Sequence, residues 1–404
     1  MSKFFLPKSF RQSMLKATRL TGMGKLLDAT RLIQRALGSA PLTWPEPRAK
    51  TEQETGPQAR RELVPAANDP KADSAPPSVI ILPPPAQPAG DPPTETPRQT
   101  SPAADPEAKR QAPRRKASFT KHAFAFNEDT YPYRLYVPSG PATSAGDARP
   151  MPLIVLLHGC KQDALDFSKG TAMNALAEEH RAMVLYPEQI TSANALRCWN
   201  WFEPGHQTAE RGEPAMIAAL TQKIVQQHGA DPQRVYIAGL SAGGAMAAVV
   251  SSQHPDMFAA VGVHSGLAAG AARDVLTAFG AMRSGAKGHN LPVMPTIVFH
   301  GTADKTVHPD NGEHITDAAL AAFKASGVKL VKTRTTGSQN GIEKTERVVY
   351  STADGKPTVE NWRIDDGAHA WSGGNAAGSY TDPDGPSASA AMLAFFLQHR
   401  LGNA

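Results

Sequence analysis

A serine between glycines has the surroundings that best suit chemistry in this chain. Residues 235–250 read VYIAGLSAGGAMAAVV, in which β-forming residues lead into Gly239-Leu-Ser241-Ala-Gly243 and then into small residues. The pentapeptide fits G-x-S-x-G, a sharp strand-to-helix turn that holds a strained serine with its hydroxyl exposed above a sheet. A glycine-rich turn with an incidental serine is the alternative. The strand-like residues before it and the helix-like residues after it favour Ser241 as a nucleophile.

A serine hydroxyl needs a base, and the base needs a carboxylate to orient it. For a turn of this kind the expected chain order is Ser, then Asp or Glu, then His. Asp304 follows the strand-like PTIVFHG (295–301), and His369 lies in a loop after TVENWRID (358–365). Ser241, Asp304 and His369 thus come in the expected order, each just past a strand, which predicts a catalytic triad.

Other acids and histidines nearby fit the triad less well. Asp310 and Asp317 fall toward or within a predicted helix, where a solvated charge is the usual case. His300 precedes the turn, and we expect its ring to pack or to hydrogen-bond the loop. His308 is expected at the rim of the site, and His264 within a strand.

Backbone N–H groups are predicted to stabilise the negative oxygen of a tetrahedral intermediate. One donor is expected from Ala242, the residue after the nucleophile. The second is expected from the loop after PLIVLLHG (152–159), which reads His-Gly-Cys-Lys-Gln from His158. Within that loop the N–H of Cys160 is our choice.

Strand-like and helix-like segments that can position these residues alternate after residue 118. The predicted strands lie within 124–138 (two strands), 152–159, 182–187, 234–239, 259–266, 295–301, 328–335, 346–352 and 358–365, and the predicted helices at 171–180, 213–229, 312–327 and 388–400. Continuous apolar runs indicate strands buried on both faces. The alternation favours an α/β fold with a mostly parallel sheet and helices on both faces. Such sheets carry their chemistry at the carboxyl ends of the strands.

Composition divides the chain into three parts. Residues 1–40 carry eight Lys and Arg against one Asp, with apolar residues at helical spacing, which predicts a basic amphipathic arm able to lie on an anionic or apolar surface. A helix packed on its own domain, or a frayed end, is the alternative. Residues 41–118 hold 18 of the 35 prolines and are predicted to be a disordered linker. Residues 119–404 form the predicted catalytic domain.

Charge and hydropathy exclude several classes of function. The net charge of +5 comes from the arm, because residues 119–404 hold 23 basic and 26 acidic residues, so we expect no nucleic-acid partner. No segment reaches the roughly 20 apolar residues of a transmembrane span. The N-terminus lacks the apolar core of a signal peptide. The spacing of Cys and His offers no metal-ligand cluster, and we expect no metal or cofactor.

From about residue 119 to 404 the chain resembles the esterase family of poly(3-hydroxybutyrate) depolymerases, whose relatives include feruloyl and acetylxylan esterases. The resemblance lies in LLHGCKQDALDF, RCWNWFEP, RVYIAGLSAGGAMA, HGTADKTVHP and DDGAHAWSGG. It implies an α/β-hydrolase fold, the triad predicted above and ester hydrolysis through an acyl-enzyme. It also implies that Cys160 supplies an oxyanion N–H and is linked to Cys198. In favour of this disulfide, the bond would hold the N–H donor of Cys160 in place. Against it, thiols in the cytosol stay reduced.

Aromatic residues near the site are candidates for substrate contact. Trp199, Trp201 and Phe202 lie in a segment expected to be a loop, where aromatic rings can line a groove and stack on a flat acyl chain. Plain packing under the loop is the alternative. Trp371, two residues after His369, is likewise an aromatic ring close to the predicted site, where it can shield the site from water.

The predicted substrate is poly(3-hydroxybutyrate) or its short oligomers, with feruloyl or acetyl esters of polysaccharide as the alternative. A peptidase, and a surface protein that uses the hydrolase domain only as a scaffold, are further alternatives. The resemblance and the predicted disulfide favour an extracellular or periplasmic protein, whereas the lack of a visible signal peptide favours the cytoplasm at polymer granules. The arm (1–40) is predicted to dock on a granule or an anionic lipid surface.

Overall fold

The computed structural model describes residues 114–141, 150–289, 291–339 and 342–402. The predicted arm (1–40) lies outside these residues, as does the predicted linker up to residue 113. The last residues assigned to the linker belong to the folded part, because β1 (Arg114–Arg115) pairs with β4 (Gly140–Pro141) and β2 begins at Ser118. The domain therefore starts before residue 119.

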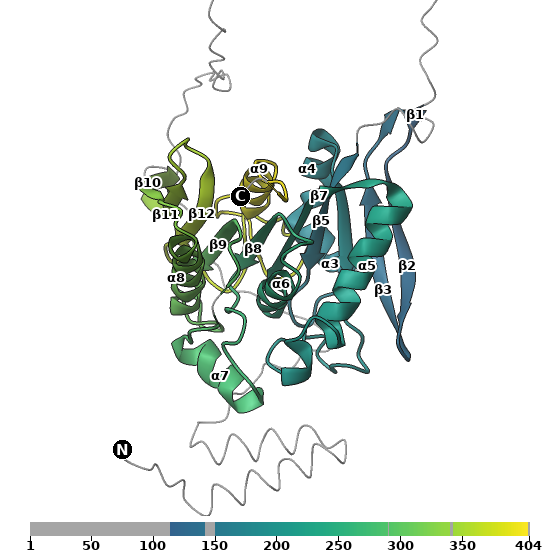
Figure 1. Cartoon of the computed structure of the whole chain (residues 1–404), viewed down its shortest axis with the longest axis horizontal. Helices are drawn as coiled ribbons and strands as arrows, with labels where there is room; N and C mark the ends of the chain where they lie inside the picture. Colours follow the sequence, from purple (N-terminus) through teal and green to yellow (C-terminus); the bar gives the residue numbers. More distant parts are fainter. Residues whose placement is uncertain (1–113, 142–149, 290, 340–341, 403–404) are drawn as a thin grey trace, which may run out of the picture. The chain divides into compact units, whose positions relative to one another are not determined.

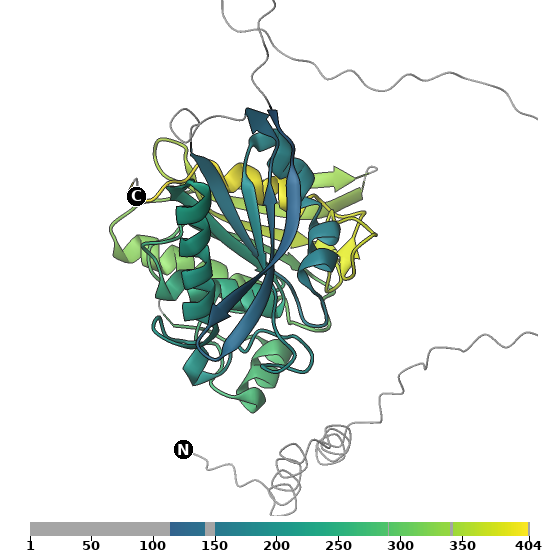
Figure 2. The ribbon, with the colours of Figure 1, turned by 90° about the vertical axis from the view of Figure 1, so that its right-hand side faces the viewer.

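Within the described residues, ten strands form one mixed sheet (Figures 1 and 2), in the order β10-β11-β12-β9-β8-β7-β5-β6-β3-β2. The strands are β2 (Ser118–Phe126), β3 (Asp129–Val137), β5 (Met151–Leu157), β6 (Met183–Pro187), β7 (Ala230–Leu240), β8 (Ala260–His264), β9 (Thr296–Gly301), β10 (Val331–Gln339), β11 (Ile342–Ser351) and β12 (Pro357–Ile364). From β12 to β6 the neighbours run parallel, and the pairs at both edges are antiparallel. The predicted, mostly parallel sheet is confirmed. Short strands β13 (Trp371–Ser372) and β14 (Thr381–Asp382) pair separately.

Helices cover both faces of this sheet (Figures 1 and 2). They are α3 (Ala164–Thr171), α4 (Met173–His180), α5 (Gly212–His228), α6 (Ala242–Gln253), α7 (Val275–Ser284), α8 (Asp310–Ala325) and α9 (Ala388–Phe396), with a 3-10 turn η1 (Pro204–His206). Helices α5 and α6 contact each other, and so do α4 and α9.

Alternate side chains of the central strands enter two different cores. In β5, Leu153, Val155 and Leu157 pack into the core that contains residues of α5 and α6. Ile154 and Leu156 pack into the core that contains residues of α3, α4 and α9. All five side chains are fully buried. Burial on both faces is why this strand reads as a continuous apolar run.

Two local features differ from the sequence prediction. The helix predicted at 171–180 is two short helices, α3 and α4, which are separated by Ala172 in the left-handed conformation (φ 51°). Helix α7 was not predicted. Its exposed residues include the apolar Val275, Leu276 and Phe279 beside polar ones, so it lacks the consistently polar outer face that marks an amphipathic helix in a sequence.

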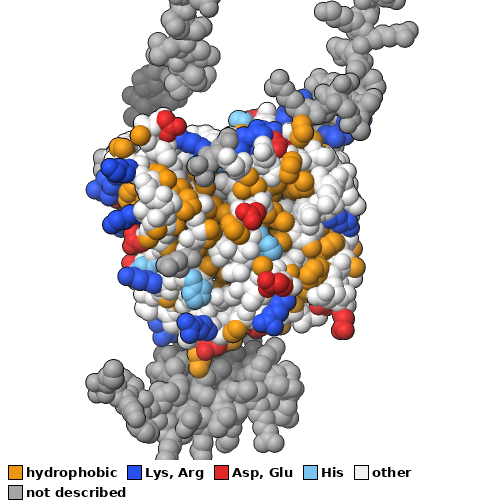
Figure 3. All heavy atoms as spheres, in the orientation of Figure 1, with side chains coloured by type: hydrophobic (Ala, Val, Ile, Leu, Met, Phe, Trp, Pro, Cys, Tyr) orange, Lys and Arg blue, Asp and Glu red, His pale blue; other side chains and the backbone are white. Residues whose placement is uncertain are grey.

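The surface of the described domain carries charges of both signs. Figure 3 shows basic and acidic side chains spread over the face in view, with apolar side chains between them. The face in view therefore lacks the continuous basic stripe that is typical of nucleic-acid-binding proteins.

Candidate active site

Ser241 lies in a strained turn between β7 and α6. Its φ is 58° and its ψ is −120°, and its N–H donates to the carbonyl of His264 at 2.9 Å. A Cβ on Gly239 would lie 2.4 Å from the Gly243 carbonyl, and one on Gly243 would lie 2.2 Å from the carbonyl oxygen of Leu157. Only glycine fits at these two positions, because α6 begins directly against the end of β5. The turn therefore has the geometry predicted from G-x-S-x-G.

Asp304 and His369 form a hydrogen-bonded pair at the end of two adjacent strands. Nδ1 of His369 lies 2.7 Å from Oδ2 of Asp304. Asp304 follows β9 and His369 follows β12, and these strands are parallel neighbours. The carboxylate is buried, whereas the histidine side chain is 13% exposed. A carboxylate acceptor at Nδ1 keeps the proton on that nitrogen and leaves Nε2 as the basic one.

The carboxyl group of Asp304 is held in its ionised form. Burial by itself raises the pKa of this group, but the neighbouring rings of His300 and His369 outweigh that effect, so the pKa lies well below its ordinary value of 3.8. Oδ1 also accepts the N–H groups of Thr306 at 2.8 Å and Val307 at 2.9 Å. An ionised carboxylate in this place can stabilise a protonated imidazole.

Other histidines near the site have partners outside the predicted triad, although Nε2 of His300 also lies 3.5 Å from Oδ2 of Asp304. Nε2 of His300 donates to the carbonyl of Val307 at 2.9 Å. The ring therefore hydrogen-bonds the loop, which is one of the two roles predicted for it. His264 ends β8 and is fully buried, and its Nε2 accepts the N–H of Ser372 at 3.0 Å. Burial lowers the pKa of His264 to about 3, so the ring is neutral. His308 is exposed to solvent.

Two aspartates that the sequence analysis set aside lie on α8. Asp310 is its first residue, Asp317 lies within it, and both are exposed. Solvated charges on a helix are what the sequence predicted for them.

Both predicted oxyanion donors lie on the edge of the sheet that carries Ser241. Ala242 is the first residue of α6, where an N–H group has no partner within the helix. Cys160 follows β5, which is the neighbour of β7, with Leu157 in register with Gly239. The two loops therefore leave the sheet at the same level. The roles of the two amides stay a prediction.

Side chains from distant segments hold the predicted oxyanion loop (158–162), called the oxyanion loop below. The N–H of Gly159 donates to Oε1 of Gln162 at 2.9 Å. Nε2 of Gln162 donates to Asp166 at 3.0 Å and to the carbonyl of Ser379 at 3.0 Å. Gln162 thus links this loop to α3 and to the segment that follows His369. Gln162 was not predicted as a site residue, because a single glutamine in a loop carries no distinguishing pattern.

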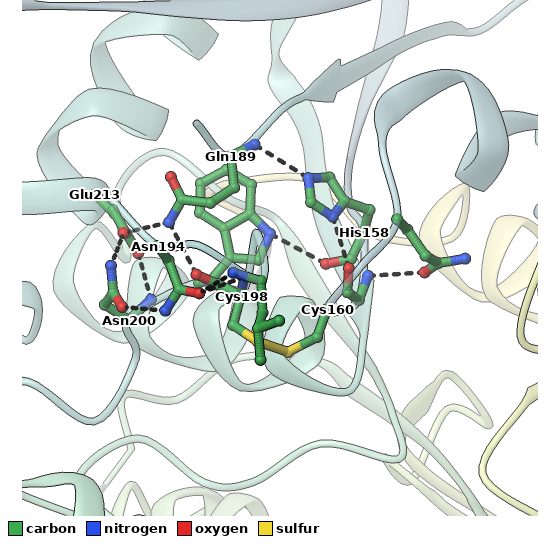
Figure 4. The surroundings of a disulfide bond; sticks show 11 residues. His158, Cys160, Gln189, Asn194, Cys198, Asn200 and Glu213 are labelled. Carbon is green, nitrogen blue, oxygen red and sulfur yellow. Dashed lines mark hydrogen bonds between the residues drawn. A yellow bond between two sulfur atoms is a disulfide. The ribbon is translucent and has the colours of Figure 1, made fainter. Parts of the chain in front are cut away.

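Cys160 and Cys198 form a disulfide, with their sulfur atoms 2.07 Å apart (Figure 4). This confirms the predicted pairing. The bridge joins the oxyanion loop to the loop that contains Trp199, whose indole N–H donates to the carbonyl of His158 at 3.1 Å. A covalent bond and a hydrogen bond therefore connect the same two loops.

The three tryptophans predicted to contact substrate are buried. Trp199 is 0% exposed, Trp201 is 4% exposed and Trp371 is 1% exposed. The indole N–H of Trp371 donates to the hydroxyl of Ser389 at 3.0 Å. Burial of this extent favours the packing alternative for these rings, since a ring without exposed area offers no face to a substrate. Any direct contact with substrate stays a prediction.

The part of the chain that the structure describes holds neither a metal-ligand cluster nor a membrane-spanning helix. No three of its His, Cys, Asp and Glu side chains come together in a way that could hold a metal ion. None of its helices combines the length and the apolar composition needed to cross a bilayer.

Comparison with known proteins connects this geometry to a family. Residues 131–339 match the model of the family described as "Esterase PHB depolymerase". The chain is 31% identical over 254 residues to poly(3-hydroxyalkanoate) depolymerase C of Paucimonas lemoignei, which covers 57% of this chain and 56% of that protein. It is 26% identical over 198 residues to a probable acetylxylan esterase A of Neosartorya fischeri, which covers 44% and 51%. The chain thus spans about half the length of these curated relatives.

Solved structures share the fold. An acetyl xylan esterase from Aspergillus awamori superposes with a TM-score of 0.51 at 18% sequence identity, over 69% of this chain and 99% of that one. At this identity the likeness concerns the fold alone. It confirms the predicted α/β-hydrolase fold.

Proposed function

This chain belongs to the esterase PHB depolymerase family, and on that premise we propose that it is a serine esterase that hydrolyses carboxylic esters through an acyl-enzyme. The observation that supports this most strongly is the strained Ser241 turn on the same sheet edge as the 2.7 Å pair between Asp304 and His369. A nucleophile, a base and an orienting carboxylate are the three groups that acyl transfer requires.

In the first half of the reaction, the hydroxyl of Ser241 attacks the ester carbonyl carbon while Nε2 of His369 takes its proton. Asp304 keeps the imidazole oriented and stabilises its cationic form. The N–H groups of Cys160 and Ala242 bind the oxygen that becomes negative. The tetrahedral intermediate then expels the alcohol, which receives the proton from His369, and the acyl group stays on the serine.

In the second half, water replaces the alcohol. His369 takes a proton from the water as its oxygen attacks the acyl carbon, and the same two N–H groups bind the oxyanion. Collapse of this intermediate breaks the bond to Ser241 and returns the proton to its oxygen. The carboxylic acid leaves, and the enzyme is ready for another ester.

Reaction with a fluorophosphonate probe tests this proposal. The probe should label the wild-type protein at Ser241, as peptide mass spectrometry would show, because only an activated serine attacks such a phosphorus centre. Absence of labelling in the folded protein, together with no hydrolysis of any soluble ester, would refute an esterase function.

For the substrate we propose poly(3-hydroxybutyrate) or its short oligomers. The support is the coverage: the relative named as a poly(3-hydroxyalkanoate) depolymerase matches 57% of this chain, against 44% for one named as an acetylxylan esterase and 33% for one named as a feruloyl esterase. Acetyl or feruloyl esters of polysaccharide are the second candidate, because the relatives also include proteins named as acetylxylan and feruloyl esterases. The ratio kcat/KM for 3-hydroxybutyrate oligomers, compared with acetylated xylan and feruloyl esters, separates the two.

For the basic arm (1–40), which lies outside the described residues, we propose docking on a polymer granule or an anionic lipid surface. The support is its eight basic residues against one acid and the helical spacing of its apolar residues. Deletion of residues 1–113 should spare the hydrolysis of soluble esters and weaken sedimentation with polymer particles or anionic vesicles. Equal sedimentation of the full-length and truncated proteins would contradict docking.

We also propose that the protein works in an oxidising compartment. The support is the disulfide between Cys160 and Cys198, because thiols in the cytosol are kept reduced. Thiol alkylation of protein taken directly from its native cells tests this, since reduced cysteines at these positions would contradict the proposal.

A further inference from the structure

A buried carboxylate lies close to the disulfide, although the reaction proposed above does not use it (Figure 4). Glu213, in the first turn of α5, is 1% exposed. It accepts hydrogen bonds from the N–H of Asn200 at 2.7 Å, from Nδ2 of Asn200 at 2.7 Å and from Nε2 of Gln189 at 2.5 Å. Removal of a carboxylate from water is costly, so a carboxylate in this place needs such donors. The positive end of the α5 dipole adds to them.

The donors to this carboxylate also hold Cys198. Nε2 of Gln189 donates to the carbonyl of Cys198 at 3.0 Å as well. Asn194 donates from Nδ2 to Oδ1 of Asn200 at 2.9 Å, and its own Oδ1 accepts the N–H of Cys198 at 3.3 Å. The disulfide links Cys198, which these hydrogen bonds hold, to Cys160. The Glu213 carboxylate is therefore connected to the oxyanion loop through three side-chain amides, those of Gln189, Asn194 and Asn200, and the covalent bond of the disulfide.

A second connection runs through His158. The N–H of Gln189 donates to Nε2 of His158 at 3.1 Å, and Nδ1 of His158 donates to the carbonyl of Gly159 at 2.8 Å. Burial lowers the pKa of His158 to about 4, so the ring remains neutral and keeps one donor and one acceptor nitrogen. Gln189 thus hydrogen-bonds Glu213 through its side chain and His158 of the oxyanion loop through its backbone N–H.

We propose that Glu213 is a positioning residue that holds the N–H of Cys160 where the oxyanion forms. This role rests on the proposed esterase function. Glu213 acts through Gln189, Asn200 and the disulfide, and not by contact with the reacting atoms. An oxyanion donor matters most in the transition state, so a displaced donor lowers kcat more than it weakens substrate binding.

Glu213→Gln tests this role, because it keeps the shape of the side chain and replaces one acceptor oxygen with an NH2 group that faces other donors. We expect kcat for a soluble aryl ester to fall about 10- to 100-fold, since removal of a whole donor costs about 10²–10³. KM should change little. The assay is run well below the unfolding temperature of the variant, as measured by circular dichroism, so that loss of folded protein does not enter kcat.

Glu360→Gln is the matched control. Glu360 is also 1% exposed and accepts three hydrogen bonds, two from Arg347 and one from the indole of Trp362. It lies on β12 and is not bonded to the oxyanion loop. This variant should lose stability but keep the kcat of the wild type. An equal loss of kcat in both variants would overturn the positioning role, because general loosening of the fold would then account for it.

If Glu213→Gln does not fold, Gln189→Met takes its place. It removes Nε2, which joins Glu213 to Cys198, and keeps the backbone N–H that binds His158. A folded variant with the kcat of the wild type overturns the inference, whereas a lower kcat at unchanged KM supports it. A wild-type protein that neither reacts with a fluorophosphonate nor hydrolyses esters would instead refute the proposed function itself.

Discussion

Ser241 adopts a positive φ that side chains with a Cβ rarely tolerate, at a cost of about 1–3 kcal/mol. Its surroundings hold it in this conformation. The carbonyl of His264 accepts the N–H of Ser241. The chain packs so closely at the flanking Gly239 and Gly243 that neither position has space for a Cβ. The backbone of Ser241 is therefore held in place before a substrate arrives, which would leave little reorganisation for the proposed reaction.

Ser241→Ala should remove the nucleophile and leave the fold intact. We expect kcat for a soluble ester to fall by about 10⁶-fold, as in other triads that lose their serine. The unfolding temperature should change little, because alanine retains the Cβ and the backbone hydrogen bond to His264. Hydrolysis assays and fluorophosphonate labelling measure this effect, and an active Ser241→Ala protein would exclude the proposed mechanism.

Asp304→Asn should be almost as damaging. The amide NH2 can face Nδ1 of His369 only if the ring places its proton on Nε2, which is the wrong tautomer for a base. We expect kcat to fall by about 10⁴-fold. Asp310→Asn serves as the control, since Asp310 is an exposed residue at the start of α8. Similar activities of the two variants would rule out an orienting role for Asp304.

At the scale of elements, the site depends on how closely α6 packs against β5. The first turn of α6 begins at Ala242, and Gly243 lies against the carbonyl oxygens of Leu157 and His158. This contact sets the distance between the serine turn and the oxyanion loop. A single methyl group at that point should therefore disturb both the stability and the site.

Gly243→Ala should destabilise the protein by about 1–3 kcal/mol, because its Cβ would lie 2.2 Å from the carbonyl oxygen of Leu157. Gly280→Ala in α7 is the matched control, since no atom lies within 4 Å of a Cβ there. It should stabilise by about 0.5–1 kcal/mol, as alanine favours a helix over glycine. Urea unfolding of both variants measures this, and an equal effect in the two would contradict tight packing at α6.

Over the whole molecule, buried histidines link stability to pH. His158 and His264 are fully buried, with pKa values lowered by burial to about 4 and about 3. In the unfolded chain both rings take up protons below their ordinary pKa of 6.5, whereas in the folded protein they do not. Acidification below pH 6.5 therefore favours the unfolded state. Burial raises the pKa of Glu213, so the folded protein protonates this group at a higher pH than the unfolded chain does. Over part of this range, acidification therefore favours the folded state through Glu213.

The free energy of unfolding should therefore decrease as the pH falls from 6.5 toward 4.5. Each of these two histidines contributes a slope of at most about 1.4 kcal/mol per pH unit, and the two together exceed the opposite effect of Glu213. His264→Gln should reduce the slope, because glutamine does not titrate in this range. Urea unfolding at several pH values measures it. Stability that is constant or increases on acidification would contradict neutral buried rings.

Pattern and chain order already determined the strand–turn–helix at Ser241, the order of Asp304 and His369, and the mostly parallel sheet. These features depend on local composition: apolar runs mark strands buried on both faces, and glycines at fixed spacing mark a sharp turn. The pairing of Cys160 with Cys198 was available from the family resemblance and not from the residues themselves.

Only the tertiary structure decided which side chains are buried and what they bond. Trp199 in its loop and Trp371 close to His369 both suited substrate contact, yet both are packed inside. Glu213 looked like an ordinary acid in the first turn of a helix, yet its carboxylate is bonded to Gln189 and Asn200. Burial and hydrogen bonding depend on contacts between segments that are far apart in the chain, and a local sequence pattern does not predict such contacts.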